Sequence, residues 1–326
     1  MTPPPPPHED TPPALRAENL GLRAKDGWTQ RHGDFEVPRG RIAALVGPNG
    51  EGKTSLLALA AGLSKPTEGT LRVLGQRPGS PGVLPRVGVL LQDRPLHGAL
   101  TVAETLRLGR ELNPAWDDAE ALSLLREADI PLRARVGRLS GGRRTCLALA
   151  MALGKRPDLL LLDEPMADLD PLRRHTMMAA LMRTAAEHGT TVVMSSHILA
   201  ELHLVCDYVL LTARGRMLIA DDTDFVQAAH TLVTYARDAP DAGTPHPFGP
   251  DGATVIETRR SGRSAATLLR LPSSLPPAVR TTPPALDEIL LAYLRSPDAT
   301  PLLAPTREAG PGGTSHSRPT TDGSGA

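Results

Sequence analysis

Residues 42–63 read IAALVGPNGEGKTSLLALAAGL. The apolar run Ile42 to Val46 predicts a buried strand, residues 47–54 fit the pattern G-x-x-x-x-G-K-[ST], and the apolar residues after them predict a helix. Glycines let the backbone fold around phosphate groups, so that its N–H groups and the helix N-terminus face the anion. In this strand, loop and helix order we predict a phosphate-binding loop rather than a glycine turn that binds nothing.

The predicted nucleotide contacts divide between the backbone of this loop and its side chains. Lys53 is expected to reach the β- and γ-phosphates of ATP, and Thr54 to supply a hydroxyl to Mg²⁺. The phosphate groups of a nucleotide and Mg²⁺ are therefore the expected ligands of the loop. The predicted ATP-binding residues are Gly47, Pro48, Asn49, Gly50, Glu51, Gly52, Lys53, Thr54 and Ser55.

The apolar runs in the rest of the chain predict the fold that carries this loop. From Leu15 to about Asp222, short apolar runs alternate with helix-length ones, which is typical of an α/β fold built on a mostly parallel sheet. Further along, two alternating runs, Thr254–Arg259 and Ala265–Leu271, flank Ser-Gly-Arg and predict an appended hairpin. Residues 285–294, ALDEILLAYL, predict an amphipathic helix that docks on a neighbour.

A second motif places two carboxylates after a strand. The four leucines Leu159–Leu162 predict a strand buried on both faces, and Asp163 and Glu164 follow at its carboxyl end, where open α/β sheets bind ligands. Asp163 can hold Mg²⁺ through water, and Glu164 can orient or deprotonate an attacking water. Alone, the pair would be read as a helix cap or a solvated turn. A phosphate-binding loop in the same chain favours the catalytic interpretation.

A third motif, Leu139-Ser140-Gly141-Gly142, precedes a helix predicted over Thr145 to Leu153. It places a hydroxyl and flexible backbone donors at a helix N-terminus, which is a second anion site of the same physical type. As an isolated motif it would be an ordinary helix start, because serine is a good N-cap. Upstream, Thr101-Val-Ala-Glu104 predicts a capping box, and Asn113-Pro114 predicts the end of the helix that it begins.

Taken in order, these motifs resemble the nucleotide-binding subunits of ATP-binding cassette (ABC) transporters, over about Leu15 to Asp222. The residues that carry the resemblance are the phosphate-binding loop (Walker A), Gln92 (Q-loop), Ser140, Gly141 and Gly142 (signature), Asp163 and Glu164 (Walker B), Ala167 to Asp170 (D-loop) and Ser195-Ser196-His197 (switch histidine). Alone, Gln92 would be a surface turn and His197 a satisfied strand-end histidine. Because of the order and spacing of the whole set of motifs, we predict instead that Gln92 and His197 are both functional residues.

The resemblance implies a particular assembly and division of roles. Two such subunits meet head to tail, so each ATP would lie between Lys53 of one chain and the signature residues 140–142 of the other. Glu164 and His197 would be catalytic, acting on water and on the γ-phosphate, while Asp170 would couple the two sites. The implied Mg²⁺ ligands are Thr54, Gln92 and Asp163. The implied partners are a second, identical nucleotide-binding subunit and a separate transmembrane permease.

The sequence departs from the family pattern at three places. Ala24 stands where an aromatic residue usually stacks on adenine, and Trp28 is a possible substitute or a packing residue. Arg143 replaces the glutamine that often follows the signature, and it either contacts ATP across the dimer or points to its own subunit or to solvent. Asp168 occupies a D-loop position where a small residue is common.

Composition limits the function classes. Lys plus Arg and Asp plus Glu balance at 36 each, so no basic field indicates nucleic acid as a partner. Two distant cysteines do not form a disulfide framework and fit a reducing compartment. No run approaches the roughly 18–20 apolar residues that a membrane span needs. We expect a cytoplasmic protein, peripheral on the inner face of the membrane through its permease.

These observations divide the chain as follows. We predict a disordered Pro-rich segment at 1–13, an ABC ATPase domain at 14–238 with a helical signature subdomain at about 93–140, an accessory region at 239–303 and a disordered tail at 304–326. Two alternatives stay open, namely an ABC ATPase of translation or repair and a regulatory module that binds ATP without hydrolysing it. The overall pattern, including the EILLAYL helix, resembles single-cassette exporter subunits that pair with a separate permease, which favours export over import.

Overall fold

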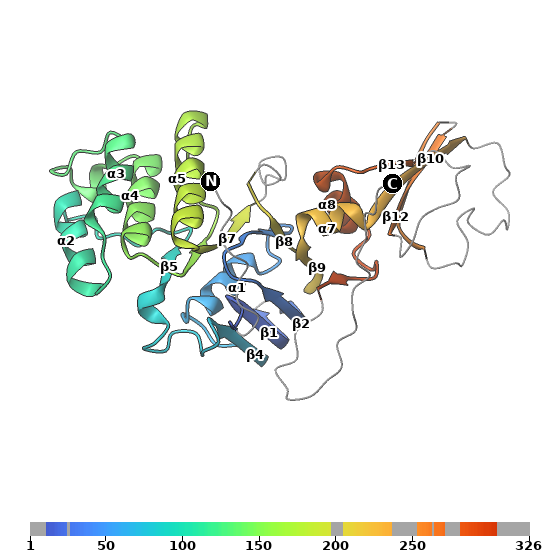
Figure 1. Cartoon of the computed structure of the whole chain (residues 1–326), viewed down its shortest axis with the longest axis horizontal. Helices are drawn as coiled ribbons and strands as arrows, with labels where there is room; N and C mark the ends of the chain where they lie inside the picture. The colour runs from blue at the N-terminus through green and yellow to red at the C-terminus, as the bar shows by residue number, and fades with distance from the viewer. Residues whose placement is uncertain are drawn as a thin grey trace, which may run out of the picture.

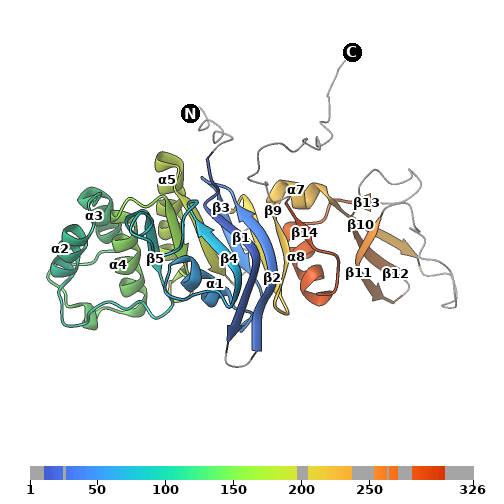
Figure 2. The same cartoon turned by 90° about the horizontal axis from the view of Figure 1, so that it is seen from below.

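The computed structural model describes residues 11–24, 27–196, 205–236, 253–262, 264–270 and 281–304. Figures 1 and 2 show a molecule of three parts along its longest axis. Helices α2 to α5 lie at one end, sheets with α1 lie in the middle, and α7, α8 and a small sheet lie at the other end. Among the described helices, none combines the length and apolar character that a bilayer crossing requires.

The central sheet has seven strands in the order β14-β9-β8-β3-β7-β6-β5. Within the described residues, β8 and β9 pair antiparallel and every other neighbouring pair is parallel. The predicted α/β fold with a mostly parallel sheet is confirmed. Its strands are β3 (Ile42–Val46), β5 (Val87–Leu90), β6 (Leu159–Leu162), β7 (Thr191–Ser196), β8 (Tyr208–Ala213), β9 (Arg216–Asp222) and β14 (Leu302–Leu303).

Alternation along β3 divides the core into two clusters. Ala43 and Leu45 face helix α1 (Lys53–Ala60) and an antiparallel sheet of β2 (Gly27–Val37), β1 (Leu15–Ala24) and β4 (Glu68–Val73). Ile42, Ala44 and Val46 belong to the other cluster, which contains α4 (Gly141–Gly154). Successive strand residues point to opposite faces, so β3 is covered on both sides and its loop starts from a rigid base.

The helical part contains α2 (Val102–Leu112), α3 (Asp118–Glu127) and α4. The predicted capping box of Thr101 and Glu104 is present, and α2 ends at Leu112 with Asn113 as its C-cap before the proline, as predicted. Helix α4 begins at Gly141, four residues before the predicted start at Thr145. The capping serine ahead of Gly141 offsets the low helix propensity of the glycines, so the helix starts inside the signature.

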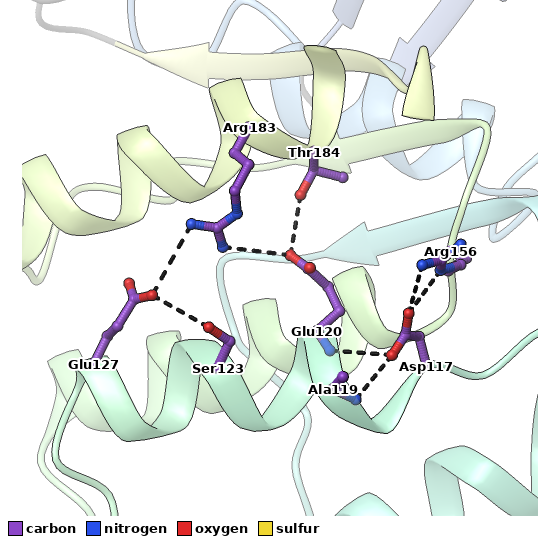
Figure 3. A network of polar contacts seen from close by, with 8 residues as sticks. All are labelled: Asp117, Ala119, Glu120, Ser123, Glu127, Arg156, Arg183 and Thr184. Atoms are coloured by element: carbon purple, nitrogen blue, oxygen red, sulfur yellow. Dashed lines mark hydrogen bonds and ion pairs between the residues drawn. The ribbon is translucent and has the colours of Figure 1, made fainter. Parts of the chain in front are cut away.

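A polar network ties the helical part to helix α5 (Pro171–His188), which follows the D-loop (Figure 3). Arg183 lies 3.7 Å from Glu120 and 4.0 Å from Glu127, both on α3, and Thr184 donates to Glu120. Glu120 is only 14% exposed. These contacts fix α3 against the helix that carries the D-loop at its N-terminus.

The C-terminal part has a sheet in the order β11-β12-β10-β13 and helices α7 and α8. The predicted hairpin is confirmed, because β11 (Thr254–Ser261) and β12 (Ser264–Arg270) pair antiparallel. The predicted amphipathic helix is α8 (Leu286–Arg295), which buries its apolar face. The remaining elements are α7 (Thr223–Ala228), β10 (His230–Ala236), β13 (Thr281–Thr282) and the 3-10 turns Leu84–Arg86 and Val136–Arg138.

The pairing of the strands does not follow the domain boundary that the sequence predicts at residue 238. Strand β10 precedes that boundary but pairs with accessory strands, whereas β14 follows it and pairs with β9 of the central sheet. The accessory part thus returns to the core at its end. Residues 1–10 and 305–326, most of the two termini for which disorder was predicted, lie outside the described part of the chain.

Candidate nucleotide site

Four neighbouring parallel strands bring the predicted site residues to one edge of the sheet. Strands β3, β7, β6 and β5 run in the same direction, so their carboxyl ends share that edge. The phosphate-binding loop follows β3, Ser195 and Ser196 end β7, and Asp163 and Glu164 follow β6. Gln92 is exposed in the turn after β5. His197 lies outside the described residues.

The phosphate-binding loop is shaped by two glycines that no larger residue could replace. A Cβ atom built on Gly47 would lie 2.4 Å from the carbonyl oxygen of Thr212, and one built on Gly52 would lie 2.7 Å from Cβ of Thr29. Gly52 also has φ of 84°, in the left-handed region that favours glycine. The loop is therefore held closely against the strands around it.

Lys53 is turned into this loop. Its ammonium nitrogen Nζ donates to the carbonyl oxygens of Gly47, at 2.8 Å, and Pro48, at 3.0 Å, and the residue is 7% exposed. Thr54 is exposed beside it. The cation is thus placed in the concavity of the loop, where a phosphate would meet it.

Within the described part of the chain, no side chain caps the N–H groups at the N-terminus of α1. The acidic residue of the loop, Glu51, is engaged elsewhere, because its Oε2 accepts from the backbone N–H of Gly215 at 3.0 Å. The loop therefore offers unpaired donors and a cation to an anion, while its own carboxylate is occupied.

At the end of β6, Asp163 is 1% exposed and its two carboxylate oxygens differ. Oδ1 accepts from the hydroxyl of Ser195 at 2.6 Å, whereas Oδ2 is buried and has no hydrogen-bond partner within the described residues. Glu164 follows with φ of 47°, and its backbone N–H donates to the same hydroxyl at 2.8 Å. One serine thus holds both acidic residues.

The buried oxygen of Asp163 fits the chemistry of Mg²⁺. In nucleotide sites this cation is bound by one or two carboxylates together with phosphates and waters, rather than by a cage of protein ligands. Within the described residues no group of three or more His, Cys, Asp or Glu could hold a metal alone. An unpaired buried carboxylate oxygen is costly unless a cation or donor approaches it, so the residues present fit Mg²⁺.

The signature and D-loop lie together within one chain. The hydroxyl of Ser140 accepts from the N–H of Arg143 at 3.4 Å, and Asp170 accepts from the N–H of Arg173 at 2.9 Å, so each caps a helix. A Cβ atom built on Gly142 would lie 3.0 Å from the carbonyl oxygen of Asp168. Figure 1 places α4 with α2 and α3, apart from α1 beside the central sheets.

Two of the three departures from the family pattern, Arg143 and Asp168, have ion-pair partners in the structure. Arg143 lies 3.4 Å from Asp129 of its own chain, and Asp168 pairs with Arg94, two residues after Gln92. The side chains of Ala24 and Trp28 lie outside the described residues.

Sequence reasoning missed the contacts of Ser195 and Arg94. A signal for Ser195 existed, since it is a polar residue continuing a buried apolar strand. Nothing local marked Arg94, whose partner is 74 residues away.

Comparisons with known proteins agree with this geometry. The family model described as ABC transporter matches residues 31–167. The chain is 34% identical over 243 residues to Nod factor export ATP-binding protein I of Ralstonia nicotianae, covering 71% of this chain and 72% of that protein. It is also 34% identical over 211 residues to the molybdenum import ATP-binding protein ModC of Mesorhizobium japonicum, covering 60% and 57% of the two chains.

Solved structures give the same result. An ATP binding subunit of an ABC transporter matches with a TM-score of 0.60 and 25% identity, over 66% of this chain and 92% of the other. The cbiO1 protein of Clostridium perfringens, described as part of the ABC transporter complex cbiONQ, matches with a TM-score of 0.55 and 26% identity, over 66% and 91%. The chain spans 57–62% of the first three curated relatives' length. By its motifs, fold and relatives, the chain belongs to the ABC transporter family, among its ATP-binding subunits.

Proposed function

We propose that this chain hydrolyses ATP to energise a separate membrane permease. The observation that carries the proposal is the shared sheet edge, where the loop of Lys53 follows β3 and the pair Asp163 and Glu164 follows β6, on either side of β7. The buried, unpaired Oδ2 of Asp163 supports a metal-dependent reaction at this edge.

Each residue at the edge has a defined task in this proposal. Lys53 exchanges its two carbonyl partners for the β- and γ-phosphates, and the N-terminus of α1 donates N–H groups to the same anion. Glu164 orients the attacking water and accepts its proton as the oxygen joins the γ-phosphorus and ADP leaves. Mg²⁺, when bound, offsets phosphate charge. Asp163 and the hydroxyl of Thr54 would hold it, with Gln92 from the turn after β5.

A second copy of the chain is part of the proposal. Gly141 and Gly142 lie beside Asp168, in the D-loop of their own chain. A head-to-tail dimer would present them and Ser140 to ATP held by the other chain. In that arrangement His197 contacts the γ-phosphate and Asp170, at the start of α5, couples the two sites.

The permease is the second proposed partner. The helical part, predicted at about 93–140, would contact it on the inner face of the membrane, which places the chain at that face as a peripheral subunit. The names of the relatives include an importer and an exporter of different solutes. Export stays a prediction that depends on the resemblance of the overall pattern, including the C-terminal helix.

Substitution of Glu164 by glutamine tests the proposal. Glu164→Gln keeps the side-chain shape and removes the base, so we expect loss of phosphate release of at least about 100-fold, the range of general acid–base catalysis. ATP binding should persist, and gel filtration should detect an ATP-dependent dimer. Lys53→Ala should instead weaken ATP binding itself, as measured by titration calorimetry.

Two results would contradict the assigned roles. Near-normal phosphate release by Glu164→Gln would exclude Glu164 as the base. Binding of ATP without hydrolysis by the unmodified chain would favour the regulatory module instead.

A further inference from the structure

Ser195 is a fully buried hydroxyl in the centre of the molecule, and the reaction proposed above assigns it no task. It lies on β7, between β3 and β6, and is 0% exposed. The three residues before it, Val192 to Met194, are apolar and equally buried. A hydroxyl in such a strand is costly to bury unless it is fully hydrogen-bonded. Its two partners therefore explain why a polar residue stands there.

The two hydrogen bonds of Ser195 run in a fixed direction. A hydroxyl has one proton to donate and can accept through its oxygen. The proton goes to Oδ1 of Asp163 at 2.6 Å, because an ionised carboxylate can only accept, and the oxygen accepts the N–H of Glu164 at 2.8 Å. Bonds in such a series polarise one another, and the series ends on the carboxylate.

The first bond sets the direction of the Asp163 carboxylate. Its backbone is held from the other side, because the N–H of Asp163 donates to the carbonyl oxygen of Leu90 on β5 at 2.8 Å. With Oδ1 occupied by Ser195, the carboxylate cannot rotate freely and Oδ2 is the oxygen left for a cation. Groups that orient a metal ligand in this way tune metal affinity strongly.

The second bond fixes the backbone of Glu164. This residue has φ of 47°, a left-handed conformation that glutamate adopts rarely, so its surroundings must hold it there. The hydroxyl of Ser195 binds the N–H of this same residue and so restrains the point from which its side chain starts. The position of the proposed base therefore depends on the same atom as the position of the proposed metal ligand.

We propose that Ser195 is a positioning residue of the hydrolytic site, whose hydroxyl aligns the carboxylate of Asp163 for the metal and the backbone of Glu164 for its base. The proposal rests on the proposed function, since it assigns Ser195 a task in that reaction. It predicts that removal of the hydroxyl impairs metal-dependent steps and spares phosphate binding by the loop of Lys53.

The test compares the unmodified chain with Ser195→Ala, Ser195→Thr and a control, Thr191→Val. Thr191 lies on the same strand and is equally buried, and its hydroxyl accepts from the N–H of Gly40 at 2.9 Å, at the opposite end of β7. The control therefore loses a buried hydrogen bond of similar kind away from the site. Thermal unfolding records the structural cost of each substitution.

The readout that does not depend on turnover is the gain in affinity for a fluorescent, non-hydrolysable ATP analogue when Mn²⁺ replaces EDTA. For Ser195→Ala we expect unchanged binding in EDTA and a gain with Mn²⁺ that is about 10–100-fold smaller, the usual range for loss of a group that orients a metal ligand. The turnover number should fall by a similar factor with little change in KM for ATP. Ser195→Thr, which keeps the hydroxyl, should retain most of the gain in affinity with Mn²⁺ and most of the turnover number.

The outcomes separate the two proposals. Hydrolysis by the unmodified chain tests the proposed function directly. If that chain hydrolyses ATP and Ser195→Ala equals it in Mn²⁺ gain and turnover, Ser195 has no positioning role. An equal loss in Thr191→Val would also overturn the inference, because it would show that any buried hydrogen bond of β7 has the same effect.

Discussion

At the scale of single residues, Arg143 has an acidic partner within its own chain. Its guanidinium lies 3.4 Å from Asp129 of the same chain, and Asp129 is 96% exposed. An ion pair this open to water contributes between zero and about 1 kcal/mol. A cation in the first turn of a helix costs about 0.3–1 kcal/mol at low salt. In the single chain these two terms nearly cancel.

We therefore expect Arg143→Gln to change the free energy of unfolding by less than about 1 kcal/mol, because the lost ion pair and the relieved repulsion offset each other. In the Glu164→Gln background, the affinity of the ATP-dependent dimer and its dependence on ionic strength should stay the same. Analytical ultracentrifugation at several salt concentrations measures both. A weaker dimer with a flatter salt dependence would establish a contact with ATP across the interface.

The sequence predicted the residues of the site better than their contacts. Lys53, Asp163 and Glu164 follow strands whose extent was predicted correctly, because apolar runs and glycine patterns are local signals. That Ser195 touches both acidic residues depends on β7 lying beside β6, and strand order is not a local property. The pairing of Arg94 with Asp168 is missed for the same reason.

At the scale of elements, Asp168 of the D-loop contacts two other loops that are distant in the sequence, the turn after β5 and the signature. It pairs with Arg94 from the turn after β5, and it lies against Gly141 and Gly142 at the start of α4. The side chain of Arg94 is only 11% exposed, whereas that of Asp168 is 48% exposed. The carboxylate of Asp168 therefore attaches the D-loop to the turn that carries Gln92, which a small residue could not do, while the backbone of Asp168 lies against the signature.

Loss of that carboxylate should destabilise the chain. Asp168→Ala leaves the largely buried guanidinium of Arg94 without this partner, at a cost of about 1–3 kcal/mol in the free energy of unfolding. Asp168→Asn, which keeps an acceptor, should cost less. Urea denaturation of Arg94→Ala, Asp168→Ala and the double variant measures the coupling, for which we expect about 0.5–3 kcal/mol. Additive effects would mean that the pair contributes nothing.

Elements with strong local signals were predicted closely. The capping box of α2 and the hairpin of β11 and β12 are examples, since each depends on residues close in sequence. Strand β14 could not be predicted, because two leucines between prolines carry no periodicity and their partner, Ile219, is more than 80 residues earlier. The early start of α4 reflects a cap that outweighs the low propensity of two glycines.

At the scale of the whole molecule, the accessory part is joined to the core by a buried polar series. Arg270 of β12 donates to the carbonyl oxygens of Thr300 and Pro301, just before β14, and to the hydroxyl of Tyr293 on α8. That hydroxyl lies 3.1 Å from Nε2 of His230, at the start of β10. Nδ1 of His230 lies 2.6 Å from the carbonyl oxygen of Val226 on α7. The series links α7, β10, β12, α8 and the approach to β14.

The charge state of His230 follows from these partners. A carbonyl can only accept, so Nδ1 carries the proton and Nε2 accepts from the hydroxyl of Tyr293, which in turn accepts from Arg270. Burial lowers the pKa of His230 from its ordinary value of 6.5 to about 4; the carbonyl of Val226 opposes this shift, and the charge of Arg270 adds to it. A proton on Nε2 would meet a hydroxyl already oriented toward it. The folded chain therefore keeps this imidazole neutral at neutral pH.

This shift predicts how stability depends on pH. Above about pH 6.5 the imidazole is neutral in both states, so it adds no dependence. As pH falls from about 6.5 to about 4, the unfolded chain binds a proton that the folded chain does not, and the free energy of unfolding falls by up to about 1.4 kcal/mol per pH unit through this group. Below about pH 4 both states are protonated and the contribution stops changing. His230→Gln should remove this part of the slope.

The measurement is urea unfolding followed by circular dichroism at intervals from pH 7.5 to 4.5. The control is His175→Gln, since His175 is exposed on α5 and its removal should leave the slope unchanged. If His230→Gln and the unmodified chain lose stability in parallel over this range, the neutral imidazole is not what makes the accessory part sensitive to acid. If the slope becomes smaller only in His230→Gln, the series from Arg270 to Val226 holds the accessory part to the core through a histidine that must stay uncharged.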